Sequence, residues 1–169
     1  LFRMHAIQGI SVSGDDAAQV QRSLASMQVR YQHQSESCLT LLDWLKQQSE
    51  FVQVLHPADT ESAGHQYWKE ICREEHSAGL VSVIFKPEYT LEDIRRFCDA
   101  LELFKLGFSW GGPVSLVMLY NLKDMRVLEH SHLKEGLLVR FCIGLEHPQD
   151  LIQDIKQALQ QLNQQKIKE

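Results

Sequence analysis

The sequence predicts an α/β protein in which a small sheet is covered by helices. Short apolar segments rich in β-branched residues alternate with segments whose apolar residues recur every three or four positions. With 169 residues, the chain has the length of one domain with a sizeable core. Neither an internal repeat nor a low-complexity linker divides it, so we expect residues 1–169 to form a single domain.

The composition is that of an ordinary globular protein with an acidic balance. Hydrophobic residues make up 44% of the chain and charged residues 23%. The formal net charge of -5 and the pI near 5.9 argue against nucleic acid or an anionic membrane surface as a partner. No apolar run approaches the roughly 20 residues that span a bilayer. Residues 1–13 lack the pattern of a signal peptide.

The four cysteines, Cys38, Cys72, Cys98 and Cys142, form no C-x-x-C pair. Because each occurs in an apolar or helical setting, we predict small buried side chains rather than reactive thiols. Free cysteines fit a reducing, cytoplasmic compartment. The chain opens on Leu1 in what resembles the middle of a longer sequence, so we expect a fragment of a larger protein.

A long helix is predicted for the N-terminal part of the chain. Ser13 followed by Asp16 resembles a capping box. The apolar positions then recur with helical spacing as far as about Lys46, which predicts one long or kinked helix with a possible break at Ser35–Ser37. The positions on its expected face are Ala17, Val20, Leu24, Met27, Tyr31, Cys38, Leu41, Leu42 and Leu45.

The middle of the chain alternates between strand and helix patterns. Phe51–Leu55 is a short strand candidate that ends at His56 and Pro57. Residues 58–65 have a loop composition, and Gln66–Arg73 suits a short helix. Leu80–Phe85 is apolar and β-branched, which predicts a buried strand.

The next helix begins after Thr90, a favourable N-cap with acidic residues in the turn that follows. Its expected inner face carries Leu91, Ile94, Phe97, Cys98 and Leu101.

The last third of the chain supplies the remaining strands and a final helix. Leu103–Trp110 and Leu137–Ile143 are predicted strands, whereas Val114–Tyr120 suits either a strand or a helix. Residues 121–136 form the longest irregular stretch, a length often linked to function. Pro148 suits the first turn of a helix, and the polar tail from residue 163 is expected to fray. The helix's apolar stripe is Leu151, Ile152, Ile155, Leu159 and Leu162.

Arg140 is the most informative polar residue. It shares one face of its predicted strand with Leu138 and Cys142, and a buried arginine needs a partner. One interpretation is an edge strand, with Arg140 reaching water or pairing with an internal carboxylate. The other is a bidentate grip on the carboxylate of a ligand, which matches the guanidinium geometry.

The segment from Ser109 to Pro113 is a second candidate, because it places a serine and a tryptophan beside two glycines. The glycines and the proline predict a turn on structural grounds alone. Glycine also permits a ligand to approach the backbone closely. Trp110 suits either a pocket wall or simple packing.

Other motifs give no comparable signal. His130 and His132 flank Ser131, yet no further residues at a zinc-like spacing accompany them, so we predict a solvated loop and no metal site. The sequence contains no G-x-S-x-G, no P-loop and no G-x-G-x-x-G motif.

Taken in order along the whole chain, these segments resemble the C-terminal domain of the pyridoxal-phosphate-dependent trans-sulfuration enzymes, and among them the cystathionine β-lyases. The resemblance implies the small C-terminal domain of the aspartate aminotransferase-like fold, with a mostly antiparallel sheet covered by helices and preceded by a long helix. The segments that carry it are Asp15–Ala17, Gln21–Leu24, His56–Pro57, Gly64–Lys69, Ser77–Ser82, Phe108–Gly112 and Val139–Glu146.

The resemblance also implies roles for three residues. Arg140 matches the arginine that holds the substrate α-carboxylate, and Ser109 matches a serine that assists at the same group. Trp110 matches the β-lyase pattern, where γ-acting relatives have leucine. Phe108 stands where the β-lyases often have tyrosine and a γ-lyase has glutamate, which argues against γ-chemistry and puts recognition of the distal part of the substrate in question. Val114 departs from the glutamate usual after the Gly-Gly turn, so the standard substrate specificity is also in question.

The family's cofactor lysine has no counterpart upstream of Asp15. The resemblance therefore implies that this chain carries the carboxylate grip but no catalytic lysine and no bound cofactor, and that it is inactive alone. The parent enzyme is expected to be a cytoplasmic homotetramer that uses pyridoxal phosphate to cleave cystathionine into homocysteine, pyruvate and ammonia. Its expected partners are the sulfur amino acid and its own N-terminal domain.

Two alternatives stay open at this point. One is the same domain of a cystathionine γ-synthase, a cystathionine γ-lyase or a methionine γ-lyase. The other is a standalone interaction module without a catalytic half. The β- or γ-specificity, the oligomeric state and the origin of the truncation are not determined by the sequence.

Overall fold

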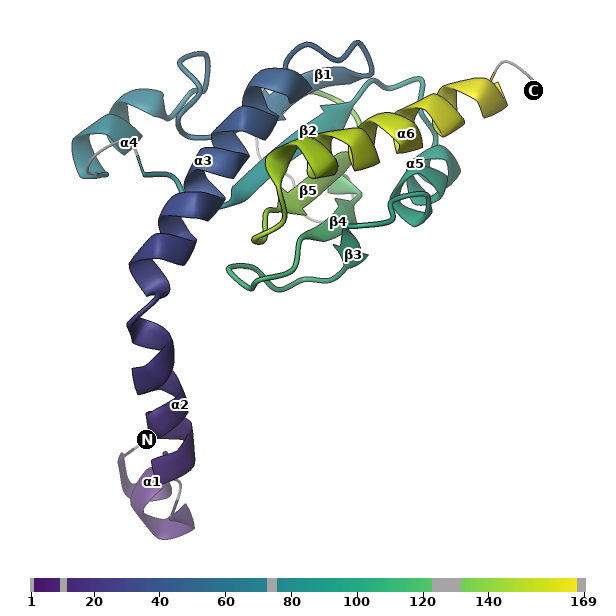
Figure 1. The fold of residues 1–169 in the computed structure, drawn as a ribbon. Helices are drawn as coiled ribbons and strands as arrows, with labels where there is room; N and C mark the ends of the chain where they lie inside the picture. The colour runs from purple at the N-terminus through teal and green to yellow at the C-terminus, as the bar shows by residue number, and fades with distance from the viewer. Residues whose placement is uncertain (1, 10–11, 73–75, 123–131, 167–169) are drawn as a thin grey trace. The chain divides into compact units, whose positions relative to one another are not determined.

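A computed structural model describes residues 2–9, 12–72, 76–122 and 132–166 (Figure 1). Residues 1–30 and 31–169 form two compact units. The helices are α1 (Phe2–Gln8), α2 (Gly14–Leu24), α3 (Met27–Leu45), α4 (His65–Ile71), α5 (Leu91–Asp99) and α6 (Pro148–Lys166). The strands are β1 (Phe51–Leu55), β2 (Leu80–Phe85), β3 (Lys105–Leu106), β4 (Leu116–Tyr120) and β5 (Leu138–Cys142).

The first unit is helical, and α2 begins at the predicted cap, Ser13. The Ser13 hydroxyl accepts the backbone N–H of Asp16 at 3.1 Å and donates to its carboxylate at 2.7 Å. The helix is interrupted at residues 25–26, where Arg30 donates to the Ser23 carbonyl at 3.0 Å. None of the residues of α2 is buried, so the expected apolar face lies on the surface of the unit.

Helix α3 rules out the alternative of a break at residues 35–37. It runs without interruption through residues 35–37, and Ser35 and Ser37 are buried rather than placed in a turn. The Ser35 hydroxyl accepts the backbone N–H of Ser77 at 3.2 Å, which satisfies its polar atom inside the fold. A serine is therefore accommodated at position 35 of this helix, because Ser77, just before β2, supplies its hydrogen-bond partner.

The second unit contains a five-stranded sheet in the order β1-β2-β5-β4-β3. Strands β1, β2, β5 and β4 pair antiparallel, and β3 alone pairs parallel, with β4. The predicted small, mostly antiparallel sheet is confirmed, and the undecided segment 114–120 contains a strand at Leu116–Tyr120. Register places Arg140 opposite Ser82 on one side and Met118 on the other.

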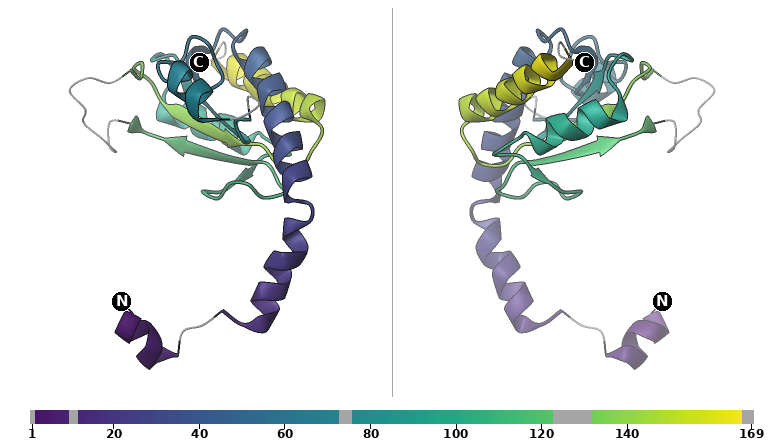
Figure 2. Two further views of the ribbon diagram at one scale, coloured as in Figure 1. Left: turned by 90° about the vertical axis from the view of Figure 1, so that its left-hand side faces the viewer. Right: turned by 90° about the vertical axis from the view of Figure 1, so that its right-hand side faces the viewer.

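Helices cover one face of this sheet (Figures 1 and 2). The side chains on that face pack into one apolar core with residues of α3, α5 and α6. Because side chains alternate along a strand, Arg140 and Tyr120 fall on the opposite, half-buried face. The strand residues in the core include Val81, Val83, Val117, Val139 and Phe141.

Strand β3 is much shorter than the predicted strand 103–110. The Asp154 carboxylate of α6 accepts the backbone N–H groups of Leu103 and Phe104 at 2.8 and 3.2 Å, so these groups are not available to a neighbouring strand. Beyond Leu106, the chain turns out of the sheet and directs carbonyl groups at Arg140. Only Lys105 and Leu106 are left to pair with β4.

The end of α6 also differs from the prediction, because the helix continues to Lys166 instead of fraying from residue 163. The Asn163 amide donates to Glu50 at 2.6 Å and accepts from the Tyr89 hydroxyl at 3.3 Å. Lys166 donates to the Glu88 carbonyl at 2.7 Å. These partners lie far away in sequence, which explains why a local pattern misses them.

Small differences separate the structure from the predictions for α4, for the inner face of α5 and for the cysteines. Helix α4 spans His65–Ile71, and the predicted end at Arg73 lies outside the described residues. Leu91 is 36% exposed, because it begins α5 rather than facing the core. The other four expected α5 positions and the whole α6 stripe are buried. Three of the cysteines are buried, whereas Cys72 is half-buried.

Candidate functional site

Arg140 lies on a central strand, so the edge-strand interpretation is wrong. Its side chain is half-buried on the sheet face opposite the helices. The described hydrogen-bond partners of its guanidinium are backbone carbonyls rather than carboxylates. The positive charge is therefore not neutralised by an internal ion pair among the described residues.

The turn after β3 holds one edge of this guanidinium. Arg140 Nη2 donates to the Phe108 carbonyl at 2.7 Å and lies 3.4 Å from the Gly107 carbonyl and 3.5 Å from the Ser109 carbonyl. The first distance is that of a good charge-assisted hydrogen bond, and the other two are marginal. The structure thus brings the predicted serine and arginine together.

Two aromatic rings flank the same guanidinium. Arg140 Cζ lies 5.9 Å from the centre of the Trp110 ring and 5.6 Å from that of Tyr120. Both distances are within the range of a cation–π contact. Trp110, the third predicted residue, is 65% exposed, whereas Tyr120 is half-buried in its strand. The sequence pattern does not single out Tyr120, because its proximity to Arg140 depends on strand register.

Arg140 Nε is buried and has no hydrogen-bond partner among the described residues. A buried unpaired donor on a charged group is costly and points to a missing partner such as a ligand or water. A guanidinium between aromatic rings offers charge and directional N–H groups, which is the chemistry that binds carboxylates. The arrangement therefore suits a small anionic group.

The turn that carries Ser109 and Trp110 is fixed from two sides. Gln34 of α3 is buried and donates through Nε2 to the Gly112 carbonyl at 2.7 Å. On the other side, the Leu145 backbone N–H donates to the Pro113 carbonyl at 2.9 Å. These bonds connect the turn to α3 and to the segment that follows β5.

Glu146 and Ser115 complete this support. The Glu146 carboxylate accepts the backbone N–H and the hydroxyl of Ser115 at 2.9 and 2.7 Å, and the Ser115 hydroxyl accepts the Gly144 N–H at 2.9 Å. A side chain at Gly144 would meet Glu146 and Pro113 at 2.5 Å. The sequence does not by itself predict the bonds between Glu146 and Ser115, although the Gly-Leu-Glu segment at 144–146 contains two of the residues involved.

Cys142 lies on the same sheet face as Arg140, and burial raises the pKa of its thiol. Burial likewise raises the pKa of Cys38 and of Cys98 to about 12. Thiols with raised pKa values are poor nucleophiles. The prediction that these cysteines pack as small apolar side chains is confirmed for these three residues.

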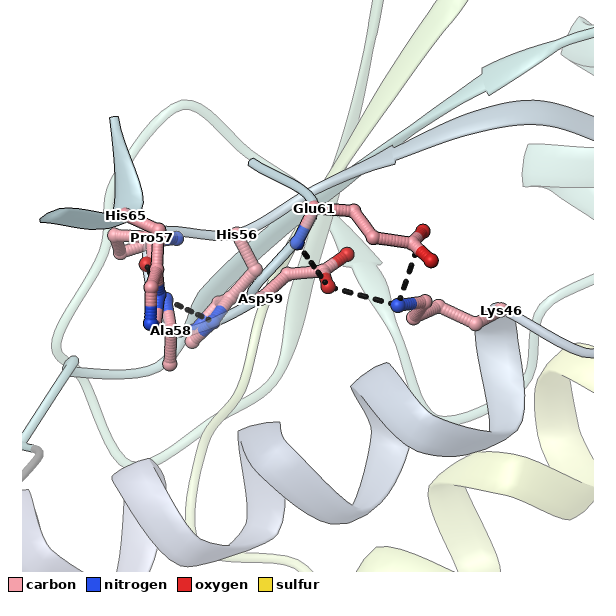
Figure 3. A network of polar contacts seen from close by, with 7 residues as sticks. All are labelled: Lys46, His56, Pro57, Ala58, Asp59, Glu61 and His65. Atoms are coloured by element: carbon pink, nitrogen blue, oxygen red, sulfur yellow. Dashed lines mark hydrogen bonds and ion pairs between the residues drawn. The ribbon is translucent and has the colours of Figure 1, made fainter. Parts of the chain in front are cut away.

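A second polar network surrounds the loop after β1 (Figure 3). Lys46 bridges Asp59 at 2.7 Å and Glu61 at 3.3 Å. His56 is buried, and its Nδ1 accepts the backbone N–H of Ala58 at 3.2 Å, whereas its Nε2 has no partner among the described residues. Burial lowers the pKa of His56 to about 4, so its ring is neutral near pH 7.

This network borders a pocket of about 300 Å³ along β1. The pocket's lining includes Lys46, Asp59, Glu61 and His132, and Lys46 is occupied by both carboxylates. His130 and Ser131 lie outside the described residues. Within the described part of the chain, no group of three or more residues could hold a metal ion, and no helix is long and apolar enough to cross a membrane.

Comparison with known proteins identifies the family in which the turn at 107–113 and the strand of Arg140 occur together. Residues 1–160 match the family described as Cys/Met metabolism PLP-dependent enzymes. The chain belongs to this family. Similarity extends over most of the 169 residues, so it includes both the turn at 107–113 and the strand that carries Arg140.

Two curated members of the Cys/Met metabolism family are similar to this chain. Cystathionine β-lyase of Bordetella avium is 36% identical over 159 residues, which cover 94% of this chain and 39% of the relative. Cystathionine β-lyase of Escherichia coli K12 is 32% identical over 151 residues, which cover 88% of this chain and 38% of the relative. The chain thus spans about two fifths of the length of these relatives.

Solved structures place the fold in the same family. A putative O-acetylhomoserine (thiol)-lyase of Campylobacter jejuni has a TM-score of 0.75 and 27% identity, and the match covers 90% of this chain and 34% of that protein. That structure contains N'-pyridoxyl-lysine-5'-monophosphate. The predicted fold class, the small domain of a pyridoxal-phosphate enzyme, is confirmed by this likeness.

Proposed function

We propose that this chain is the substrate-carboxylate-binding domain of a pyridoxal-phosphate-dependent carbon–sulfur lyase that cleaves cystathionine to homocysteine, pyruvate and ammonia. The observation that carries the proposal is Arg140, whose guanidinium is flanked by two rings and whose buried Nε has no partner among the described residues. The similarity to cystathionine β-lyases supports the choice of substrate.

In this proposal, Arg140 binds the α-carboxylate of the amino acid, and Ser109 assists at the same group. The Phe108 carbonyl fixes the guanidinium before the substrate arrives, which lowers the entropy lost on binding. A fixed carboxylate sets the direction of the other bonds at the α-carbon. Trp110 borders the site and limits the space beside the substrate.

The cofactor is expected to be held by residues outside this chain. Pyridoxal phosphate, when bound, supplies an electron sink for the elimination. The described lysines with known partners are engaged away from Arg140, namely Lys46 with Asp59, Lys105 with the Glu102 carbonyl and Lys166 with the Glu88 carbonyl. The residues around Arg140 therefore fit the substrate carboxylate, and the lysine of the Schiff base is expected outside this chain.

We further propose that residues 1–169 are one C-terminal domain of a cytoplasmic, homotetrameric enzyme, and that the domain is inactive alone. The relatives' greater length supports the expectation that the remainder of the enzyme is its principal partner.

A second candidate is an enzyme that acts at the γ-carbon. The likeness to the Campylobacter O-acetylhomoserine (thiol)-lyase favours it. Trp110 and Phe108 favour β-elimination, because the γ-acting relatives are expected to have leucine and glutamate there. The two candidates differ in product, since β-elimination from cystathionine yields pyruvate and γ-elimination yields 2-oxobutyrate.

The test uses the natural full-length protein. We expect a yellow protein that releases pyruvate from cystathionine. Arg140→Ala is expected to keep the colour and lose roughly 100-fold or more in kcat/KM, because one partner of a charge pair is removed. Release of 2-oxobutyrate would select the second candidate, and a colourless protein would contradict both.

A further inference from the structure

We propose that Tyr120 is a positioning residue for Arg140, which holds the guanidinium in the orientation that receives the substrate carboxylate. The contact itself is independent of the reaction, whereas its effect on substrate binding rests on the proposed function. Tyr120 is therefore expected to determine how well the carboxylate is bound, without touching the reacting atoms.

Strand register brings the two residues together. Met118 pairs with Arg140 and Tyr120 pairs with Leu138, so Tyr120 is the diagonal neighbour of Arg140 on the same sheet face. The centre of the Tyr120 ring lies 5.6 Å from Arg140 Cζ. Tyr120 ends β4, and its pairing with Leu138 of β5 holds its backbone, which gives the ring a defined position beside Arg140.

Tyr120 also contacts the residue that binds the guanidinium. The Phe108 ring lies 6.4 Å from the Tyr120 ring at an interplanar angle of 67°, an edge-to-face contact. The Phe108 carbonyl accepts from Arg140 Nη2 at 2.7 Å. Tyr120 thus supports the arginine and its acceptor at the same time.

The other flanking ring is less suited to this role. Trp110 is 65% exposed and belongs to the turn rather than to a strand. Its ring is also farther from the guanidinium, at 5.9 Å compared with 5.6 Å. We therefore assign the fixed support to Tyr120 and the open side of the site to Trp110.

The first test measures the arginine and not the reaction. Full-length protein is treated with phenylglyoxal, which labels arginine, and the labelling rate of Arg140 is followed by mass spectrometry relative to exposed Arg22. Tyr120→Leu and Tyr120→Met are expected to speed Arg140 labelling by about fivefold, because one face of the guanidinium loses its cover. Tyr120→Phe, which keeps the ring, is expected to match the wild type.

The second test measures cystathionine cleavage in the same variants. Tyr120→Leu is expected to raise KM by about tenfold with a smaller change in kcat, and Tyr120→Phe to restore the wild-type KM. Tyr67→Leu on α4 removes an exposed ring elsewhere and serves as the control. A merely structural defect would lower the amount of folded enzyme and leave KM unchanged.

The two tests separate the two proposals. Faster Arg140 labelling in a protein without lyase activity would support the positioning role and contradict the proposed function. Labelling and KM at wild-type values in Tyr120→Leu or Tyr120→Met would overturn the positioning role. A change in kcat alone would also overturn it, because carboxylate binding would not depend on the ring.

Discussion

Glu146 holds Ser115 through both of its carboxylate oxygens. Oε1 accepts the Ser115 backbone N–H at 2.9 Å, and Oε2 accepts its hydroxyl at 2.7 Å. Ser115 is fully buried and directly precedes β4. Since Glu146 follows β5, this pair fixes the two strands that carry Tyr120 and Arg140 against each other.

Replacing Glu146 by alanine is expected to lower the free energy of unfolding by about 2 kcal/mol, because two buried donors of Ser115 lose their acceptor. Urea unfolding of the variant measures this change. Glu70→Ala removes an exposed glutamate on α4 and is expected to change stability by less than about 0.5 kcal/mol. Equal effects of both substitutions would contradict the assigned role of Glu146.

Gly144→Ala is expected to destabilise the fold by roughly 3 kcal/mol. The added methyl group would lie 2.5 Å from Glu146 Oε2 and from the Pro113 carbonyl, and 2.6 Å from the Ser115 nitrogen. Two of these three are backbone atoms, so the neighbours cannot move aside easily. Gly14→Ala, where the methyl group meets open space, is the matched control in thermal unfolding.

The strands could be predicted because their signals are local. Leu80–Phe85 and Phe51–Leu55 match the observed strands, since β-branched apolar runs between turn residues carry the pattern of a buried strand. The predicted strand at 103–110 was too long, because backbone groups on both sides of β3 bond to Asp154 and Arg140, which are distant in sequence. No window of neighbouring residues contains that information.

The residues of the candidate site also fall into two groups, those with a local sequence signal and those whose role depends on distant contacts. Arg140 could be proposed from the sequence because a charge within an apolar strand is visible locally, and Ser109 and Trp110 because two glycines and a proline follow them. Tyr120 and Glu146 were not found, because their roles depend on strand register and on a contact across 31 positions. Residues that support the candidate site are therefore harder to propose from the sequence than Arg140, Ser109 and Trp110.

The stability of the fold is expected to fall below neutral pH because of His56. Burial lowers its pKa from 6.5 to about 4, so the unfolded state binds a proton between these values while the folded state does not. The contribution of neutral His56 is complete above about pH 6.5 and is lost as the pH falls towards 4. A shift of this size corresponds to about 3 kcal/mol.

Unfolding free energies measured from pH 7 to pH 4 check this expectation. His56→Gln is expected to flatten the pH dependence, whereas His147→Gln, on an exposed residue, should leave it unchanged. A wild-type slope that survives in His56→Gln would assign the pH dependence to other groups.

Gln34 links helix α3 to the turn that carries Ser109 and Trp110. It is 6% exposed, and its Nε2 donates to the Gly112 carbonyl at 2.7 Å. Gln34→Leu keeps the packing volume but removes this donor. We expect the free energy of unfolding to fall by about 1–2 kcal/mol, because the partly buried Gly112 carbonyl loses its donor.

The same substitution is expected to loosen the turn beside Arg140, and so to raise KM for cystathionine by several-fold in the full-length enzyme. Gln47→Leu is the control, because Gln47 bonds within its own helix region to the Asp43 carbonyl and is exposed. Gln34→Glu gives a second measure, since it retains the shape but places an acceptor against the carbonyl. A KM equal to the wild type in both Gln34 variants would show that the turn keeps its geometry without α3, and would restrict the role of Gln34 to stability.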